Sequence, residues 1–335
     1  MVSKQVNERP PVSKAKGEAA DGKGIDAKKT SKKISLPILI CLFVAVFVIS
    51  ILVLFVVSDV EKPKEEIEIL GWCPTISGQM INSDECLYNG TAVKKMDFQS
   101  TIDSWAASVD GRKGIVIYDL DAQEIVGSYN TDEKFATASI YKLFVVYEGY
   151  RKLQSGEWET SMAAGNTGRT VLQCLDLAIR ESHSPCAETL WAMIGRDSLD
   201  NVVQSEFGLP NVVVGSLSAT PTEVMKMMRR FYYHSDIVDE NLIEIMQDSF
   251  LNQPVTTYNW RQGLPSGFSD KVEVYNKVGW NFNGSYWTIY DDAAIVKFVN
   301  EKRNFIVVVM TNGIHYDKIR NLATEVEKSF YQQYQ

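Results

Sequence analysis

Hydrophobic and polar positions alternate regularly from Met96 to the end of the chain, and the pattern predicts strands near both ends of this region with helices between them. The predicted strands are 114–120, 124–129, 272–278, 286–296 and 305–311. The predicted helices are 98–109, a helix that carries Ser139, 170–191, 221–233 and 316–331. The short turn Asp121-Ala-Gln123 joins the first two strands as a hairpin.

This order of elements predicts an α+β domain over residues 96–335. Strands contributed by both ends of the domain would pair into one five-stranded antiparallel sheet, and the middle of the chain would form a helical subdomain. A cleft is expected where these two parts meet. Thr220 is expected to cap the helix that begins at Pro221.

A long uncharged run precedes the domain. Residues 1–33 are rich in Lys and small or polar residues, so we predict a disordered tail. Ile34 to Ser58 carries no charge and is long enough to span a bilayer as a helix. The alternative is a cleaved signal peptide, but its apolar run would be about 7–15 residues with small residues at its end. This run ends in Leu54-Phe-Val-Val57, so we favour an uncleaved anchor.

Charge predicts how that anchor is oriented. Nine Lys or Arg residues precede the span, whereas acidic residues dominate just after it, which places the N-terminus in the cytoplasm. Residues 59–95 are then an extracytoplasmic stalk and irregular segment, and the domain also lies outside the membrane. The protein is expected to be a single-pass protein of the cell membrane.

Four cysteines fall in the predicted extracytoplasmic part, which is an even number in an oxidising compartment. Of the three ways to pair them we prefer the sequence-local one, and free buried thiols remain the alternative. The preferred pairs are Cys73 with Cys86 and Cys174 with Cys186.

Composition narrows the choice of partners. The 335 residues are 45% hydrophobic and carry a net charge of −8, without a basic face interleaved with aromatic residues, so we expect no nucleic-acid partner. The chain has no Cys-x-x-Cys, and its three histidines are scattered, so we expect no metal site and no cofactor.

The strongest chemical signal is Ser139-Ile-Tyr-Lys142. On a helix these two residues lie on one face about 5–6 Å apart at Cβ, so the lysine amine could take the serine proton. The apolar residues after Lys142 would desolvate the amine and favour its neutral form. The pattern alone is weak, because Ser13-Lys-Ala-Lys16 in the N-terminal tail also fits it. A capping serine followed by a surface lysine is the ordinary alternative.

Two further stretches strengthen the signal: Ser182-His-Ser184, and Lys277-Val-Gly279 on a predicted late strand. Ser-x-x-Lys, Ser-x-polar and Lys-x-Gly, in this order, resemble the penicillin-recognising serine hydrolases, the class A β-lactamases and related D,D-peptidases. The resemblance covers roughly Met96 to Gln335 and includes the Thr220-Pro221 helix start and the last two strands.

The resemblance implies a role for each matching residue. Ser139 would attack an acyl carbonyl and carry the acyl-enzyme, and Lys142 would accept its proton. Ser182 would relay a proton to the leaving nitrogen, and Lys277 would hold that hydroxyl and attract a substrate carboxylate. Backbone N–H groups of Ser139 and Trp280 would form the oxyanion hole. Ser184, Val278 and Gly279 would line the substrate site.

The same residues have ordinary alternatives. Ser182 and Ser184 could be turn or capping residues, and Lys277 could be a charge that protects an edge strand from aggregation.

Three departures from the family bear on function. Ser184 stands where Asn is usual, and His183 where Asp is usual. Val278 replaces a Thr or Ser and so removes a hydroxyl that would bind the substrate carboxylate. No Glu-x-x-Leu-Asn pattern supplies a deacylation base, and Glu206 is the nearest candidate, with a solvated loop charge as its alternative.

The leading hypothesis is therefore a membrane-anchored extracytoplasmic serine hydrolase. It would be acylated at Ser139 by β-lactams or by peptidoglycan stem peptides that end in D-Ala-D-Ala. D,D-peptidase-like behaviour is one alternative. The other is an inactive module that binds a cell-wall peptide or a protein. A Ser-His-Asp hydrolase is disfavoured because the chain lacks Gly-x-Ser-x-Gly.

Overall fold

The computed structural model describes residues 85–88, 91–253, 260–282, 284–285 and 287–335. The predicted tail, the predicted membrane span 34–58 and Cys73 lie outside these residues. Within the described ranges no helix combines the length and the apolar character needed to cross a bilayer.

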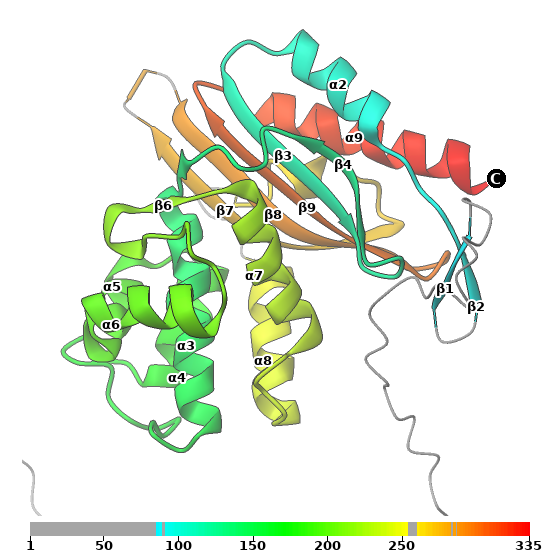
Figure 1. The fold of residues 1–335 in the computed structure, drawn as a ribbon. Helices are drawn as coiled ribbons and strands as arrows, with labels where there is room; N and C mark the ends of the chain where they lie inside the picture. The colour runs from blue at the N-terminus through cyan, green and yellow to red at the C-terminus, as the bar shows by residue number, and fades with distance from the viewer. Residues whose placement is uncertain (1–84, 89–90, 254–259, 283, 286) are drawn as a thin grey trace, which may run out of the picture. The chain divides into compact units, whose positions relative to one another are not determined.

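A five-stranded antiparallel sheet forms the centre of the domain (Figure 1), with strand order β4-β3-β9-β8-β7. The strands are β3 (Arg112–Asp119), β4 (Glu124–Tyr129), β7 (Val272–Phe282), β8 (Trp287–Phe298) and β9 (Arg303–Asn312). The predicted hairpin and the pairing of strands from both ends of the domain are confirmed. The late strands continue beyond their predicted ends, and β7 forms one edge of the sheet.

Side chains on the two faces of the sheet enter two separate cores, as the alternation along β9 shows. Ile306, Val308 and Met310 pack with the helical subdomain, whereas Val307 and Val309 pack with the helices on the opposite face. Helices α2 and α9 cover that opposite face, and α3 to α8 lie on the other side of the sheet (Figure 1). The described helices are α2 (Gln99–Ser108), α3 (Lys142–Gln154), α4 (Val171–Arg180), α5 (Ser184–Ile194), α6 (Arg196–Asn201), α7 (Pro221–Tyr233), α8 (Glu240–Leu251) and α9 (Tyr316–Tyr334).

Local capping explains several helix starts. The Thr220 hydroxyl accepts a hydrogen bond from the Glu223 N–H, so the predicted cap of α7 is confirmed. Thr170 caps α4 in the same way, with Gln173 completing a capping box. The single helix predicted over 170–191 is wrong, because the chain breaks between α4 and α5. Helices α6 and α8 were not predicted.

Short elements connect these parts. A two-stranded antiparallel hairpin, β1 with β2, occupies the end of the segment that was expected to be irregular. The remaining short elements are β1 (Glu85–Tyr88), β2 (Thr91–Lys94), β5 (Phe135–Ala136), η1 (Ala138–Tyr141), η2 (Val202–Glu206), η3 (Val214–Ser216), β6 (Ser218–Ala219) and η4 (Leu264–Ser266).

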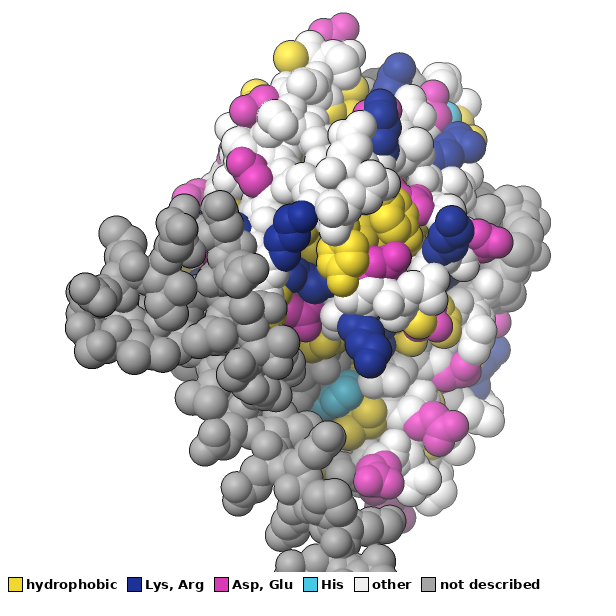
Figure 2. Space-filling model, turned by 90° about the vertical axis from the view of Figure 1, so that its right-hand side faces the viewer, with side chains coloured by type: hydrophobic (Ala, Val, Ile, Leu, Met, Phe, Trp, Pro, Cys, Tyr) yellow, Lys and Arg dark blue, Asp and Glu magenta, His cyan; other side chains and the backbone are white. Residues whose placement is uncertain are grey.

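Charges of both signs share the surface of the domain. On the face drawn in Figure 2, Lys and Arg side chains alternate with Asp and Glu around a small group of hydrophobic side chains.

Candidate active site

Ser139 lies on a short 3-10 turn, η1, and Lys142 is the first residue of α3. The turn is held from both sides, since the Ile140 N–H donates to the Thr137 carbonyl at 2.8 Å and the Thr137 N–H donates to the Leu217 carbonyl at 2.8 Å. Ala138 has a positive φ of 39°, which ends the preceding strand direction abruptly. The prediction that Ser139 and Lys142 lie on one regular α-helix is therefore wrong.

Ser182 occupies the break between α4 and α5 and has a positive φ of 53°. The N–H groups of Glu181 and His183 both donate to the Leu177 carbonyl at 3.0 Å, which closes the end of α4. His183 Nδ1 then accepts from the Cys186 N–H at 3.2 Å and caps α5. A left-handed residue between two capped helix ends turns the Ser182 side chain out of both helices.

A disulfide joins Cys174 on α4 to Cys186 on α5 and confirms one of the two preferred pairings. It bridges the break that holds Ser182 and so fixes the relative position of the two helices. For the other preferred pairing, Cys73 and the side chain of Cys86 lie outside what the structure describes.

Lys277 projects from the edge strand β7 toward the helical subdomain. Gly279, two residues further on, faces the same way, and a Cβ built there would collide with the Thr137 carbonyl and with Ile140. Only a glycine allows β7 to pack this closely against the Ser139 turn. The absence of that side chain brings the Lys277 strand and the serine turn into contact.

Both lysines converge on Ser182. Lys142 Nζ donates to the Ser182 carbonyl at 2.5 Å, to Ser182 Oγ at 3.2 Å and to Ser184 Oγ at 3.0 Å. Lys277 Nζ donates to the same Ser182 Oγ at 2.9 Å and to the Val278 carbonyl at 2.7 Å. One hydroxyl therefore connects two amines that lie far apart in the sequence.

Burial makes these two amines unusual. Lys142 is 0% exposed and Lys277 is 1% exposed. Burial lowers the pKa of Lys142 to about 8, and the Glu188 carboxylate opposes this shift. Burial also lowers the pKa of Lys277 well below its ordinary value, Lys142 lowers it further, and Asp292 opposes both effects. Burial thus weakens proton binding at both amines, and the neutral form of Lys142, which can accept a proton, becomes well populated near pH 8.

Ser139 itself is half-buried, and its hydroxyl makes no hydrogen bond to any residue that the structure describes. The Lys142 amine instead donates its three hydrogen bonds to oxygens of Ser182 and Ser184. Trp280, whose N–H was expected in the oxyanion hole, follows Gly279, and its ring packs on Trp260 with 5.3 Å between ring centroids. The backbone segments of Ser139 and Trp280 thus belong to the two parts that meet at Gly279.

Two predicted residues do not join this group. The side chain of Val278 is 1% exposed and packs in the core on the opposite face of the sheet, so it does not line the site.

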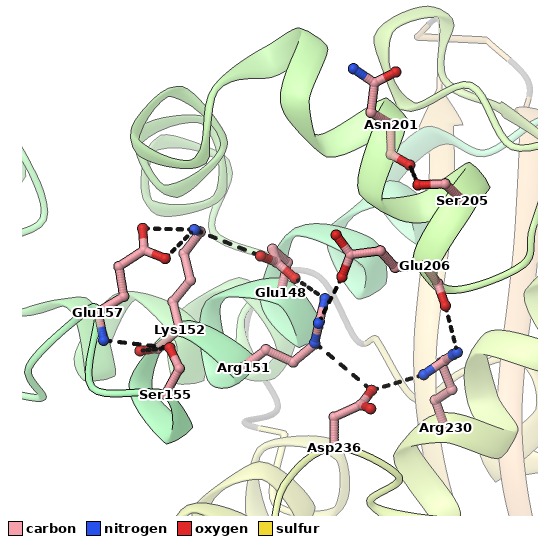
Figure 3. Close-up of polar contacts among 10 residues, drawn as sticks. All are labelled: Glu148, Arg151, Lys152, Ser155, Glu157, Asn201, Ser205, Glu206, Arg230 and Asp236. Carbon is pink, nitrogen blue, oxygen red and sulfur yellow. Dashed lines mark hydrogen bonds and ion pairs between the residues drawn. The ribbon is translucent and has the colours of Figure 1, made fainter.

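Glu206 binds Arg151 at 2.8 Å, within an ion-pair network that also contains Glu148 and Asp236 (Figure 3). Arg151 lies near the C-terminal end of α3, about 13 Å along the helix axis from Lys142 at about 1.5 Å per residue. The structure does not bring Glu206 to the candidate site.

A carboxylate that received no role from the sequence is bonded to the serine turn. Tyr141, between Ser139 and Lys142, donates its hydroxyl to Glu188 Oε1 at 2.7 Å, and Arg196 binds Glu188 Oε2 at 2.6 Å. The signal was present in the sequence, because Glu188 follows Ser184 by one helical turn. In the described ranges no three His, Cys, Asp or Glu side chains are grouped so as to hold a metal ion.

Comparisons with known proteins identify the fold. A β-lactamase from Streptosporangium roseum has a TM-score of 0.59 and 17% identity, with 70% of this chain and 98% of that chain covered. An ancestral (GNCA) class A β-lactamase has a TM-score of 0.59 and 15% identity, covering 70% and 100%. A mutant of PBP-A in an acyl-enzyme complex with penicillin G has a TM-score of 0.59 and 16% identity, covering 70% and 95%.

At these identities the structural likenesses establish the fold, which is that of the class A β-lactamases. A search of curated protein sequences finds no match. The sequence profile of the β-lactamase enzyme family, however, matches residues 97–334, which is more than half of the chain. The chain therefore belongs to the β-lactamase enzyme family.

Proposed function

We propose that the protein is a serine hydrolase that is acylated at Ser139 by β-lactams or by peptidoglycan peptides ending in D-Ala-D-Ala. One observation carries the proposal: two buried amines, Lys142 and Lys277, share the hydroxyl of Ser182 beside the turn that holds Ser139. Burying two cations is costly unless the site uses their neutral forms. The acyl-enzyme complex of a PBP-A mutant with penicillin G supports the choice of substrate.

Acylation would proceed by proton transfer along this group. Ser139 Oγ attacks the carbonyl carbon and passes its proton to neutral Lys142, while the carbonyl oxygen receives N–H groups of Ser139 and Trp280. The C–N bond then breaks, and the Ser182 hydroxyl gives a proton to the departing nitrogen. Ser182 regains its proton from Lys142, so the amine is restored and Ser139 holds the acyl group as an ester.

Ser184 and Lys277 would hold the substrate. The Ser184 hydroxyl already contacts Lys142 Nζ and could bind the substrate amide, and the Lys277 amine would donate a hydrogen bond to the carboxylate of either substrate. Because the Val278 side chain is buried, the carboxylate would depend on Lys277 and on backbone donors.

Location completes the proposal. The uncharged run 34–58 would anchor the chain in the cell membrane with its N-terminus in the cytoplasm, and the hydrolase domain would face the cell wall. The Cys174–Cys186 disulfide supports an oxidising compartment.

A second candidate is an inactive member that binds a cell-wall peptide or a protein partner at the same site. It is favoured by one observation: among the described residues the Ser139 hydroxyl has no hydrogen bond, so the nucleophile is not yet paired with its base. Catalytic hydrogen bonds are often formed only when substrate is bound, so this observation is compatible with both candidates.

Covalent labelling separates the two. The purified full-length chain is incubated with a fluorescent penicillin, denatured and examined for bound dye. We expect labelling of the wild type and its loss in Ser139→Ala, because the ester cannot form without the hydroxyl. Ser13→Ala, which alters the other Ser-x-x-Lys copy, is the matched control and should keep the label. A wild type that stays unlabelled at saturating penicillin would leave only the binding module.

A further inference from the structure

Glu188 shares one face of α5 with Ser184. The two residues are one helical turn apart, and side chains at this spacing lie about 5–6 Å from each other. The Ser184 hydroxyl is 3.0 Å from Lys142 Nζ, so this face of α5 is turned toward the candidate site. The Glu188 carboxylate is therefore presented next to the serine turn rather than to the opposite side of the helix.

Contacts fix the direction of the Glu188 side chain. Its Oε1 accepts from Tyr141, which belongs to the same 3-10 turn as Ser139, and its Oε2 binds Arg196. Tyr141 is itself held against Trp191, with 5.5 Å between the ring centroids. The carboxylate is thus anchored to the turn of the nucleophile on one side and to a surface arginine on the other.

The carboxylate also remains open to water. Its side chain is 43% exposed, whereas the Lys142 side chain is fully buried. A carboxylate can accept roughly four hydrogen bonds, and two are used among the described residues. Glu188 is also the carboxylate whose charge acts on Lys142. A base for hydrolysis must lie near the acylated serine and be open to water, and Glu188 combines contact with the serine turn and exposure to water.

We propose that Glu188 is the general base that activates the water for deacylation. The inference rests on the proposed acylation of Ser139. The carboxylate removes a proton from water as the water oxygen bonds to the ester carbonyl carbon. The tetrahedral intermediate collapses, the bond between that carbon and Ser139 Oγ breaks, and Glu188 returns the proton to Oγ. One water is consumed, and the product leaves as a carboxylic acid.

Glu206 provides a matched comparison. It is also a glutamate that binds an arginine, at 2.8 Å, and its side chain is 52% exposed. Its partner Arg151, however, lies near the far end of α3, and among the described residues no hydrogen bond or ion pair joins the Glu206 side chain to the serine turn. The two glutamates thus differ mainly in that Glu188 accepts a hydrogen bond from Tyr141 of that turn.

The test follows the acyl-enzyme by intact mass after a short exposure of the full-length chain to penicillin G. Glu188→Gln keeps the shape and the Tyr141 contact but loses the base. We expect its acylation rate to match the wild type and its deacylation to slow by about 10²-fold or more. Glu188→Asp, which shifts the carboxylate, should give an intermediate rate, and Glu206→Gln should behave as the wild type. A merely structural effect would alter acylation and deacylation together.

Two results would overturn the inference while leaving acylation intact. One is a Glu188→Gln acyl-enzyme that decays at the wild-type rate, and the other is a wild-type acyl-enzyme that does not decay at all. If the wild type never gains the mass of penicillin, the proposed function fails, and the role of Glu188 fails with it.

Discussion

The two ends of helix α3 place a cation in opposite surroundings. At the N-terminal end, Lys142 is fully buried among neutral oxygens and has no carboxylate within ion-pair distance in the described ranges. At the C-terminal end, Arg151 is partly exposed and binds Glu148 and Glu206 at 2.8 Å and Asp236 at 3.9 Å (Figure 3). One helix thus carries an uncompensated cation and a fully compensated one.

The difference shows in their proton affinities. Burial lowers the pKa of Lys142 to about 8. Burial acts in the same direction on Arg151, but its bonds to Glu206 and Glu148 outweigh that effect and raise its pKa above the ordinary value. A group that is buried without a counter-ion becomes reactive at the cost of stability, whereas a group in a network of counter-ions stabilises the fold and stays charged.

The largest expected effect comes from removing the uncompensated cation. In Lys142→Met the Ser139 proton has no acceptor, so we expect the rate of acylation by penicillin to fall by about 10³-fold, within the range of a lost general base. The free energy of unfolding should change by about 1 kcal/mol or less, because relief from burying an amine offsets the lost hydrogen bonds. Stopped-flow labelling and urea unfolding measure the two quantities. Acylation at the wild-type rate would remove Lys142 from the mechanism.

The opposite result is expected at the other end of α3. Arg151→Met leaves Glu148, whose side chain is 8% exposed, with Lys152 at 3.7 Å as its one remaining ion-pair partner among the described residues. We expect a loss of about 2 kcal/mol in the free energy of unfolding, because a mostly buried carboxylate loses its closest partner. Acylation should be unchanged.

Lys328→Met is the control for this stability effect. Its ion pair with Glu325 is exposed on both sides, so its removal should cost about 0–1 kcal/mol. If Arg151→Met unfolds at the same urea concentration as Lys328→Met, the network around Arg151 does not stabilise the fold.

The sequence predicted much of the fold because alternation and capping act locally. The strands of the sheet were predicted from the periodicity of hydrophobic residues, and the Thr220 cap was predicted from residue type. The break at Ser182 was missed because it depends on one left-handed residue between two helices that a disulfide joins. Periodicity continues across such a break, so hydrophobic spacing could not reveal it.

The site was predictable where residue type decides the chemistry and unpredictable where packing does. Ser182 and Lys277 were found by their order in the chain, and the structure places them together. Val278 was misplaced because its role came from the resemblance to the family, although alternation along a strand already sends its side chain to the face opposite Lys277. Residue type does not distinguish Glu188 from Glu206, and only the path of the chain decides that Glu188 contacts Tyr141 of the serine turn whereas Glu206 binds Arg151.

A pH dependence sharpens the contrast between the two ends of α3. Only neutral Lys142 can take the Ser139 proton, so the acylation rate should rise about tenfold per pH unit below its pKa of about 8 and level off above it. The depressed pKa also means that, between about 8 and the ordinary 10.5, the unfolded chain binds more protons than the folded chain. Over that window this group makes the free energy of unfolding rise with pH. In Lys142→Met the free energy of unfolding should no longer show the rise with pH that the Lys142 amine causes. In Arg151→Met the acylation rate and the free energy of unfolding should keep their dependence on pH, because the arginine that is removed does not titrate in this range. A wild-type acylation rate that is flat from pH 6 to pH 9, roughly the range around the pKa of Lys142, would show that its amine is not the acceptor.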